Sequence, residues 1–346
     1  MHLYPGVRLH IVDSCTIKIS YGARGSLLFK ELLPDEHAWV CSLTHSSVKQ
    51  KTELCDENPD LFARVQPLSK ALYTHGFARK TPIFRKGTLH AHTSVESITL
   101  NARGLDGPAV ISRRKAAVVA VRGISRTSFH ALTALASAGI ENFVLDDPGP
   151  VETLDMSAEP FIVKGAATRE AAVSHAFKHN WPNVRIRSTD TPVDAVLLAG
   201  AYGTDLYHAA HLQAGNIPHM TAVESASSTR VGPFIIPALT GCLNCVHVAT
   251  AEHGVNDDVA TFCSPDTHEV PAAASTVSAA MAGAFIAGQM LQYIDGFIPF
   301  TSSRIVFFDS FGQLPTSVLW SADSTCLCQA EKTTISENFE NQCAAV

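Results

Sequence analysis

Four of the nine cysteines stand in two close pairs of a kind that binds metals. Cys242 and Cys245 form C-x-x-C in TGCLNC, directly after an apolar stretch and a turn, and Cys326 and Cys328 form C-x-C in STCLCQ. Four thiolates on two tight loops suit tetrahedral structural zinc, and such a closed site leaves no open position for catalysis. A structural zinc site is therefore predicted. Four unrelated thiols, or a redox pair at Cys242 and Cys245, are the alternatives.

The stretch Lys115–Asp147 indicates the scaffold that must position these cysteines. Ala116–Val121 is a short apolar run rich in β-branched residues, which is typical of a buried parallel strand. Gly123 opens a turn, and Phe143–Leu145 is the next strand. Between them an apolar stripe at helical spacing is formed by Phe129, Leu132, Leu135 and Ala136. This order of strand, helix and strand predicts the first half of a Rossmann-type nucleotide-binding fold.

The glycine fingerprint of that fold is degenerate here. Its six G-x-G-x-x-G positions fall on 123–128, and Gly123 is the one glycine that remains. Ser125 and Ser128 are small enough to keep the course of the backbone. Arg126 is bulky and would crowd the phosphate path unless it binds the phosphate itself. The loop therefore favours the fold and argues against productive ATP binding.

Composition and charge narrow the class of protein further. The chain has 346 residues, 46% of them hydrophobic, and a formal net charge of −6, which argues against binding of nucleic acid by phosphate neutralisation. Met1–Val12 lacks the apolar core of a signal peptide, and an odd number of cysteines favours a reducing cytoplasm. Pro271–Ile294 is rich in Ala and Gly and is interpreted as a buried or interface helix, not a membrane span.

Outside this core the chain divides into modules. Residues 1–85 predict a winged-helix-like α+β module, with strands at Val7–Val12 and Thr16–Tyr21 and a helix at Asp60–His75. It is either a plain extension of the fold or a peptide clamp that pairs an open strand edge with an extended peptide. Residues 86–114 are predicted as a linker with a short strand at Ser97–Asn101. Strands and helices alternate through 115–328, a doubly wound α/β pattern, and the polar tail 329–346 is predicted to be disordered.

These elements together resemble the ThiF fold of ubiquitin-activating-enzyme-like proteins. The resemblance rests on AGIENFVLDD, DAVLLAG and NIPHM, followed by VGPFIIPALTGCLNCVHV and the terminal CLC. Within that superfamily the chain is most similar to the partner proteins of cyclodehydratases in azole-forming (TOMM) peptide clusters. The segment GPFIIPALTGCLNC matches their G-P-x-x-x-P-x-x-x-x-C-x-x-C. The resemblance covers residues 115–328, while the N-terminal module matches a winged-helix leader-peptide clamp in size and strand order.

The resemblance implies two different functions. Catalytic ThiF-like proteins bind Mg-ATP and adenylate a carboxyl terminus. Asp146 and Asp147 match their ribose-binding acidic position, so Gly123, Arg126, Asp146 and Asp147 form a degenerate nucleotide site. The S-N-x-x-R-Q segment is replaced by Leu154–Pro160. At two further positions the charged group that the family uses is lost or displaced. Ala166 stands at the lysine position of a G-K-x-K segment that is reduced to Gly165 and Arg169. The position of the magnesium-binding aspartate falls near Ala201, with Asp205 close by.

The TOMM partner proteins fit these losses better, because they keep the fold but act as scaffolds. They bind the leader segment of a precursor peptide and present its core to a YcaO-type ATP-dependent cyclodehydratase. We therefore expect a cytoplasmic, zinc-bearing peptide-binding partner protein with no catalytic residue of its own. The alternative is an active ATP- and Mg-dependent adenylyltransferase in which Arg122 and Arg126 bind the phosphates. A third reading is a structural paralogue that self-associates, and a homodimer is expected because ThiF-like proteins commonly form one.

Overall fold

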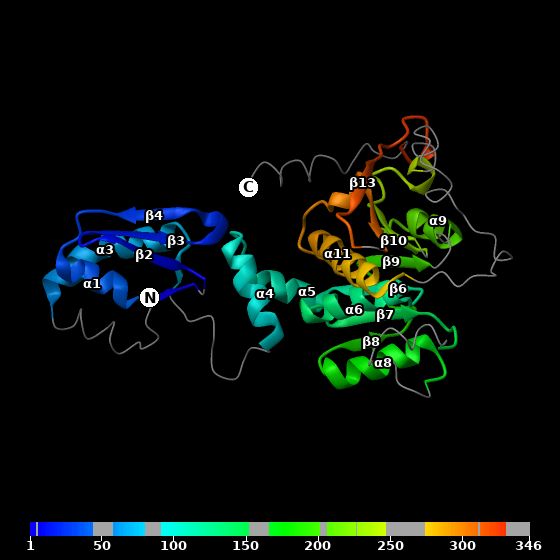
Figure 1. The fold of residues 1–346 in the computed structure, drawn as a ribbon, viewed down its shortest axis with the longest axis horizontal. Coiled ribbons are helices and arrows are strands. Elements are labelled where there is room, and N and C mark those ends of the chain that lie inside the picture. Colours follow the sequence, from blue (N-terminus) through cyan, green and yellow to red (C-terminus); the bar gives the residue numbers. More distant parts are fainter. Residues whose placement is uncertain are drawn as a thin grey trace. The chain divides into compact units, whose positions relative to one another are not determined.

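The computed structural model describes residues 1–4, 6–43, 58–79, 91–151, 166–200, 206–225, 227–246, 274–310 and 312–329. The chain forms two compact units, Met1–Ser112 and Arg113–Val346 (Figure 1). The predicted disordered tail lies outside the described residues except for Gln329. The replaced segment 154–160 and residues 165, 201 and 205 lie outside them as well.

In the first unit a small antiparallel sheet packs against helices. The described strands β2 (Arg8–Asp13), β3 (Thr16–Ser20) and β4 (Ser26–Phe29) pair in the order β2-β3-β4. Helices α1 (Pro34–Ser42) and α3 (Pro59–Thr74) contribute to the same core as β3. This core includes Ile17, Ile19, Trp39, Val40, Leu61, Val65 and Leu72. A second pair of short strands, β1 (His2–Leu3) and β5 (Ala78–Arg79), is antiparallel. The predicted strands and helices of this module are confirmed.

The predicted short strand in the linker is wrong. Residues 97–101 lie in helix α4 (Ala91–Ala102), and α5 (Gly107–Ala116) follows. The β-branched residues near this position favour a strand locally, but tertiary contacts decide otherwise. Leu100 of α4 packs on Val110 and Ile111 of α5, and the Asn101 side-chain oxygen accepts a hydrogen bond from the Gly107 amide at 2.9 Å. The turn between the helices is thereby closed, so these residues form a helical pair.

Eight described strands form one sheet in the second unit, in the order β13-β12-β11-β10-β9-β6-β7-β8. The strands β10, β9, β6, β7 and β8 run parallel, and β11, β12 and β13 extend the sheet antiparallel. Their bounds are β6 (Val118–Arg122), β7 (Asn142–Asp146), β8 (Arg185–Arg187), β9 (Ala195–Gly200), β10 (His219–Glu224), β11 (Ser228–Ile235), β12 (Arg304–Asp309) and β13 (Thr316–Leu319). This is the predicted Rossmann-like α/β arrangement.

Four described helices complete this unit, namely α6 (Arg126–Ser137), α8 (Arg169–Asn180), α9 (Leu206–Ala214) and α11 (Thr276–Ile294). Helix α11 is long and apolar enough to cross a membrane, and half of its most apolar window is buried. It packs along α6 at close range, because a Cβ on Gly283 would lie 2.7 Å from the Thr127 carbonyl oxygen and 2.9 Å from the Ala131 nitrogen. It also shares the main core with β11 and β12. These contacts are those of a core helix of the fold.

One buried histidine makes the stability of the second unit depend on pH. His219 at the start of β10 is 1% exposed, and burial lowers its pKa, although a hydrogen bond to the Ile217 carbonyl oxygen acts in the opposite direction. In the unfolded chain the His219 imidazole is protonated as the pH falls through about 6.5, whereas in the folded chain it stays neutral to a lower pH. The stability contributed by this group is complete above about pH 6.5 and is lost as the pH falls below it.

We expect wild type to lose more free energy of unfolding between pH 7.5 and pH 5.5 than His219→Gln does. Urea titrations at the two pH values measure this difference. The exposed His179→Gln serves as the control and should behave as wild type. An equal loss in wild type and His219→Gln would contradict the assignment.

Candidate functional site

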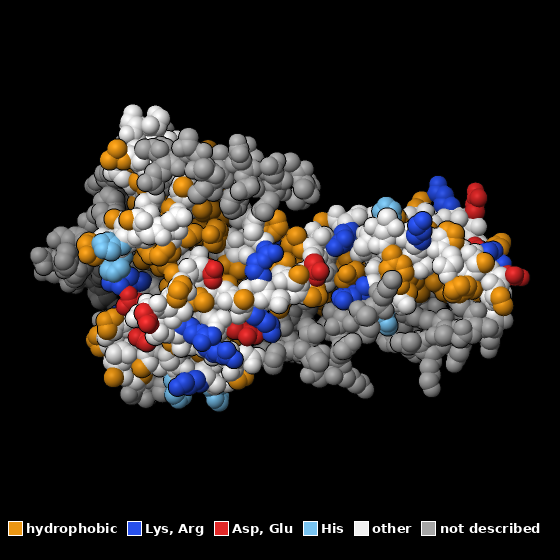
Figure 2. Space-filling view, turned by 180° about the vertical axis from the view of Figure 1, so that it is seen from behind, with side chains coloured by type: hydrophobic (Ala, Val, Ile, Leu, Met, Phe, Trp, Pro, Cys, Tyr) orange, Lys and Arg blue, Asp and Glu red, His pale blue; other side chains and the backbone are white. Residues whose placement is uncertain are grey.

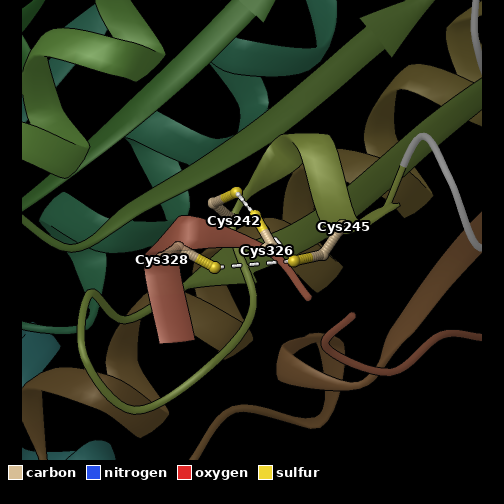
Figure 3. Close-up of side chains that lie close together, drawn as sticks. All are labelled: Cys242, Cys245, Cys326 and Cys328. Atoms are coloured by element: carbon tan, nitrogen blue, oxygen red, sulfur yellow. Dashed lines mark hydrogen bonds between the residues drawn. The ribbon is translucent and has the colours of Figure 1, made fainter. Parts of the chain in front are cut away.

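The four cysteines of the two motifs lie together, as Figure 3 shows. The sulfurs of Cys242 and Cys326 are 3.7 Å apart, and those of Cys245 and Cys328 are 3.5 Å apart. All four sulfurs lie within 4.8 Å of one another. A tetrahedron with Zn–S bonds of about 2.3 Å has S···S edges of about 3.8 Å. The cluster therefore has the donor set and the spacing that hold one metal ion, and four thiolates are what structural zinc takes.

Burial opposes ionisation of two of the four thiols as long as no cation is bound. Burial raises the pKa of Cys245 to about 12 and also raises that of Cys242. The Cys328 backbone amide, by contrast, lowers the pKa of Cys326 to about 7. Four adjacent thiolates would repel one another and resist ionisation, whereas a divalent ion deprotonates the thiols that it binds. The site is thus consistent with the predicted structural zinc.

The cluster lies where the segment with Cys326 and Cys328 packs on the sheet. Cys326 and Cys328 come from the turn that includes η3 (Leu327–Gln329), and they pack with Ile235 of β11 and Ile305 of β12. Trp320 covers the same small core and is 6% exposed. The metal would therefore fix the C-terminal segment of the second unit, which is a structural role.

The degenerate glycine loop keeps the backbone course that the fold requires. Gly123 follows β6 with φ +83°, and a Cβ at this position would lie 2.0 Å from the Ala199 carbonyl oxygen of β9. Ser125 caps α6, because its side chain accepts from the Ser128 amide and its own amide donates to the Ser128 hydroxyl. The two serines thus replace the missing glycines with a capping box.

A buried carboxylate occupies the N-terminus of α6, where a Rossmann-type fold places a phosphate. Glu224, the last residue of β10, is 3% exposed. Its Oε1 accepts from the Ser125 hydroxyl at 2.6 Å and from the Thr127 amide at 2.8 Å. Its Oε2 accepts from the Ala274 amide at 3.4 Å. The anion that the helix N-terminus attracts is therefore supplied by the protein itself.

The Arg126 guanidinium is bound to protein groups and is not free to bind a phosphate at the N-terminus of α6. Its Nη1 donates to the Ala274 carbonyl oxygen at 2.9 Å, and its Nη2 donates to the Thr276 hydroxyl at 2.5 Å. Thr276 is the first residue of α11. Arg126 thus joins the beginning of α6 to the beginning of α11.

The two aspartates after β7, Asp146 and Asp147, are also bound to groups of the protein itself. Asp146 forms an ion pair with Arg122 at the end of β6. Asp147 accepts from the Ile124 amide at 2.6 Å and from the Gly149 amide at 2.9 Å, and an Arg169 Nη1 lies 3.9 Å from its carboxylate. The carboxylate expected at a ribose therefore holds the loop after β6 in place.

Removal of the Glu224 carboxylate tests its contribution to the stability of the fold. We expect Glu224→Ala to lower the free energy of unfolding by about 1–3 kcal/mol, because the buried Thr127 amide and the half-buried Ser125 hydroxyl lose their acceptor. Glu224→Gln keeps an acceptor oxygen and should lose less. Denaturant titration measures both variants, and wild-type stability in Glu224→Ala would contradict these contacts.

Comparisons with known proteins relate the fold to solved structures. No protein-family model matches the sequence, and a search of curated proteins finds no match. The structure of the microcin C7 biosynthetic enzyme MccB in complex with N-formylated MccA matches with a TM-score of 0.62 and 16% identity, over 95% of this chain and 99% of that one. E. coli MccB with ATP matches with a TM-score of 0.60 and 15% identity, over 94% and 98%.

The structure of a second protein, PaaA, matches with a TM-score of 0.66 and 15% identity, over 91% of this chain and 99% of PaaA. This chain has the ThiF-like fold. The predicted ThiF-like architecture is therefore confirmed, and the match extends over both compact units.

Proposed function

We propose that this chain binds a precursor peptide and presents it to a YcaO-type ATP-dependent cyclodehydratase, without adenylating the peptide itself. One similarity supports a peptide as ligand: several of the MccB structures that share this fold contain MccA, including its N-formylated form. The leader peptide would bind to the N-terminal module, and the proposed metal site would hold the second unit together.

The observation that carries the proposal is the Glu224 carboxylate at the N-terminus of α6. It accepts from the Ser125 hydroxyl and the Thr127 amide, groups that would otherwise be available to a phosphate. A phosphate brought to this place would meet a buried negative charge, and like charges at close range repel strongly in a low dielectric. The N-terminus of α6 therefore presents a negative charge, whereas acyl-adenylate chemistry depends on positive groups at the phosphates.

The second candidate is an ATP-dependent adenylyltransferase, favoured by the E. coli MccB structures with ATP and AMPCPP. It would need cations on the phosphates. Arg122 and Arg126 are the residues predicted for that role, but one pairs with Asp146 and the other binds Ala274 and Thr276. Both would have to exchange these partners, which makes the scaffold the better-supported function.

The remaining partners follow from the same proposal. On the face drawn in Figure 2, the Lys and Arg side chains of the described residues are interspersed with Asp and Glu, so a nucleic acid is not proposed as a partner. A homodimer in the cytoplasm is proposed, with structural Zn²⁺ as the bound metal.

Reconstitution tests the proposal. The zinc-loaded chain is mixed with a YcaO-type cyclodehydratase and a Cys/Ser/Thr-rich precursor peptide encoded beside it, and mass spectrometry follows the loss of water from the peptide. We expect dehydration to require all three components and ATP. Release of pyrophosphate by this chain with peptide and ATP alone would overturn the proposal in favour of adenylation.

A further inference from the structure

The two cysteine motifs meet sulfur to sulfur across the cluster. Cys242 of the first motif lies 3.7 Å from Cys326 of the second, and Cys245 lies 3.5 Å from Cys328; Figure 3 shows both contacts as dashed lines. Within the C-x-x-C motif the sulfurs of Cys242 and Cys245 are 4.0 Å apart. Each sulfur of one motif therefore has a close neighbour in the other motif.

These contacts suit two disulfides that link the motifs. The separations are short enough that rotation of the side chains brings the sulfurs to the S–S bond length of about 2.0 Å. Pairing of Cys242 with Cys245 would use the longer of the given separations. It would also leave the segment that carries Cys326 and Cys328 without a covalent link to the sheet.

The cluster lies at the surface of the second unit, where a small oxidant reaches it. Leu327, between the two cysteines of the second motif, is 88% exposed, and Asn244 of the first motif is exposed as well. Cys245 is buried, whereas the other three cysteines are half-buried. A divalent metal holds the sulfurs as thiolates, and the thiolate is the form that peroxide attacks.

We propose that hydrogen peroxide converts the cluster into two disulfides, Cys242–Cys326 and Cys245–Cys328, and releases the metal. This inference goes beyond the proposed function and rests on the zinc that is proposed with it. For each disulfide, one thiolate attacks a peroxide oxygen, the O–O bond breaks and hydroxide leaves. The second thiolate attacks the resulting sulfenic sulfur, the S–S bond forms and a second hydroxide leaves. Two peroxide molecules are thus reduced, four thiolates are oxidised, and Zn²⁺ leaves without a change of charge.

The two disulfides would hold the segment that the metal holds in the reduced protein. Their cysteines are 84 and 83 positions apart in the sequence, and a cross-link that closes a long loop restricts the unfolded chain strongly. The second unit therefore keeps its fold under oxidation although it loses zinc. We expect the oxidised, metal-free chain to melt at least about 5 °C above the metal-free chain that is kept reduced.

Peroxide treatment of the full zinc-loaded chain tests the proposal. A chromophoric chelator follows the release of zinc, and mass spectrometry of the protein digested without reduction identifies the linked cysteines. Chymotrypsin cleaves after large apolar residues, so cuts at Leu243 and Leu327 separate the two cysteines of each motif. We expect release of the zinc together with both cross-motif disulfides. Cys15→Ser, which removes an exposed thiol of the first unit, should release zinc as wild type does.

Two matched double variants test the pairing. Cys242→Ser with Cys326→Ser leaves Cys245 and Cys328, the pair at 3.5 Å. Cys242→Ser with Cys328→Ser also leaves one cysteine in each motif, Cys245 and Cys326. We expect peroxide to link the first pair at least about tenfold faster than the second, because bond formation depends on the approach of the two sulfurs. Circular dichroism verifies that both variants are folded.

The peptide map of wild type decides the outcome even where a variant fails to fold. A disulfide within the C-x-x-C motif, a link to a cysteine outside the cluster, or sulfinic acids without a cross-link would overturn the proposal. Equal rates in the two double variants would overturn the pairing. A purified chain that forms both cross-motif disulfides but contains no zinc before oxidation would support the pairing and overturn the proposed metal.

Discussion

Cys245→Ser is expected to abolish stoichiometric metal binding and to lower the melting temperature of the second unit by about 10 °C or more. The reason is the position of the cluster: Cys245 is fully buried and packs with Ile235, Ile305 and Trp320, while its sulfur lies 3.5 Å from that of Cys328. Loss of one ligand removes the ion, and the metal-binding free energy is then no longer available to fix the C-terminal segment.

Elemental analysis and differential scanning calorimetry measure the two effects. Wild type should contain one zinc per chain, and a chelator should reproduce the instability of Cys245→Ser. Cys15→Ser is the matched control, because Cys15 is an exposed thiol in the first unit, outside the cluster. Metal-free wild type that melts at the temperature of the loaded protein would contradict a structural site.

Asp295→Ala is expected to destabilise the second unit by about 3–5 kcal/mol, because it leaves a buried guanidinium without its counterion. Asp295 is the C-cap of α11, and its carboxylate accepts two hydrogen bonds from Arg114, at 2.9 Å from Nε and 2.7 Å from Nη2. The two side chains are 4% and 6% exposed. Arg114 Nη1 also donates to the Ala138 carbonyl oxygen at the end of α6. One ion pair thus joins the C-terminal ends of α5, α6 and α11.

The neighbouring pair of Lys115 and Glu141 supplies the control. It has a similar N–O distance of 3.0 Å, but its side chains are 33% and 28% exposed, so Glu141→Ala should cost at most about 1 kcal/mol. Urea unfolding followed by circular dichroism compares the two variants. Equal, small losses would show that the buried pair contributes no more than a surface one.

Periodicity and motif spacing predicted the parts of the fold whose determinants are local. The apolar run before Gly123, the stripe of α6 and the strand that ends at Asp146 all lie in one stretch, and the structure has them at the expected places. The cysteine pairs were found for a related reason, because each pair is close in sequence even though the two meet across 83 residues.

The features that sequence reasoning missed depend on contacts between distant residues. Glu224 reaches the Thr127 amide across 97 positions, and a lone Glu at the end of an apolar strand was the one signal for it. Asp147 matched a ribose-binding position, yet its partners are backbone amides at Ile124 and Gly149. The helix α4 was mistaken for linker and strand because its stability comes from packing on Val110 and Ile111.

Calorimetric titration of the purified, zinc-loaded chain with Mg-ATP tests the central claim most directly. E. coli MccB, which has been crystallised with ATP, is the positive control in the same buffer. With Glu224 at the N-terminus of α6, we predict no heat of binding up to millimolar ATP. Micromolar binding by this chain would contradict the account and make adenylation its function.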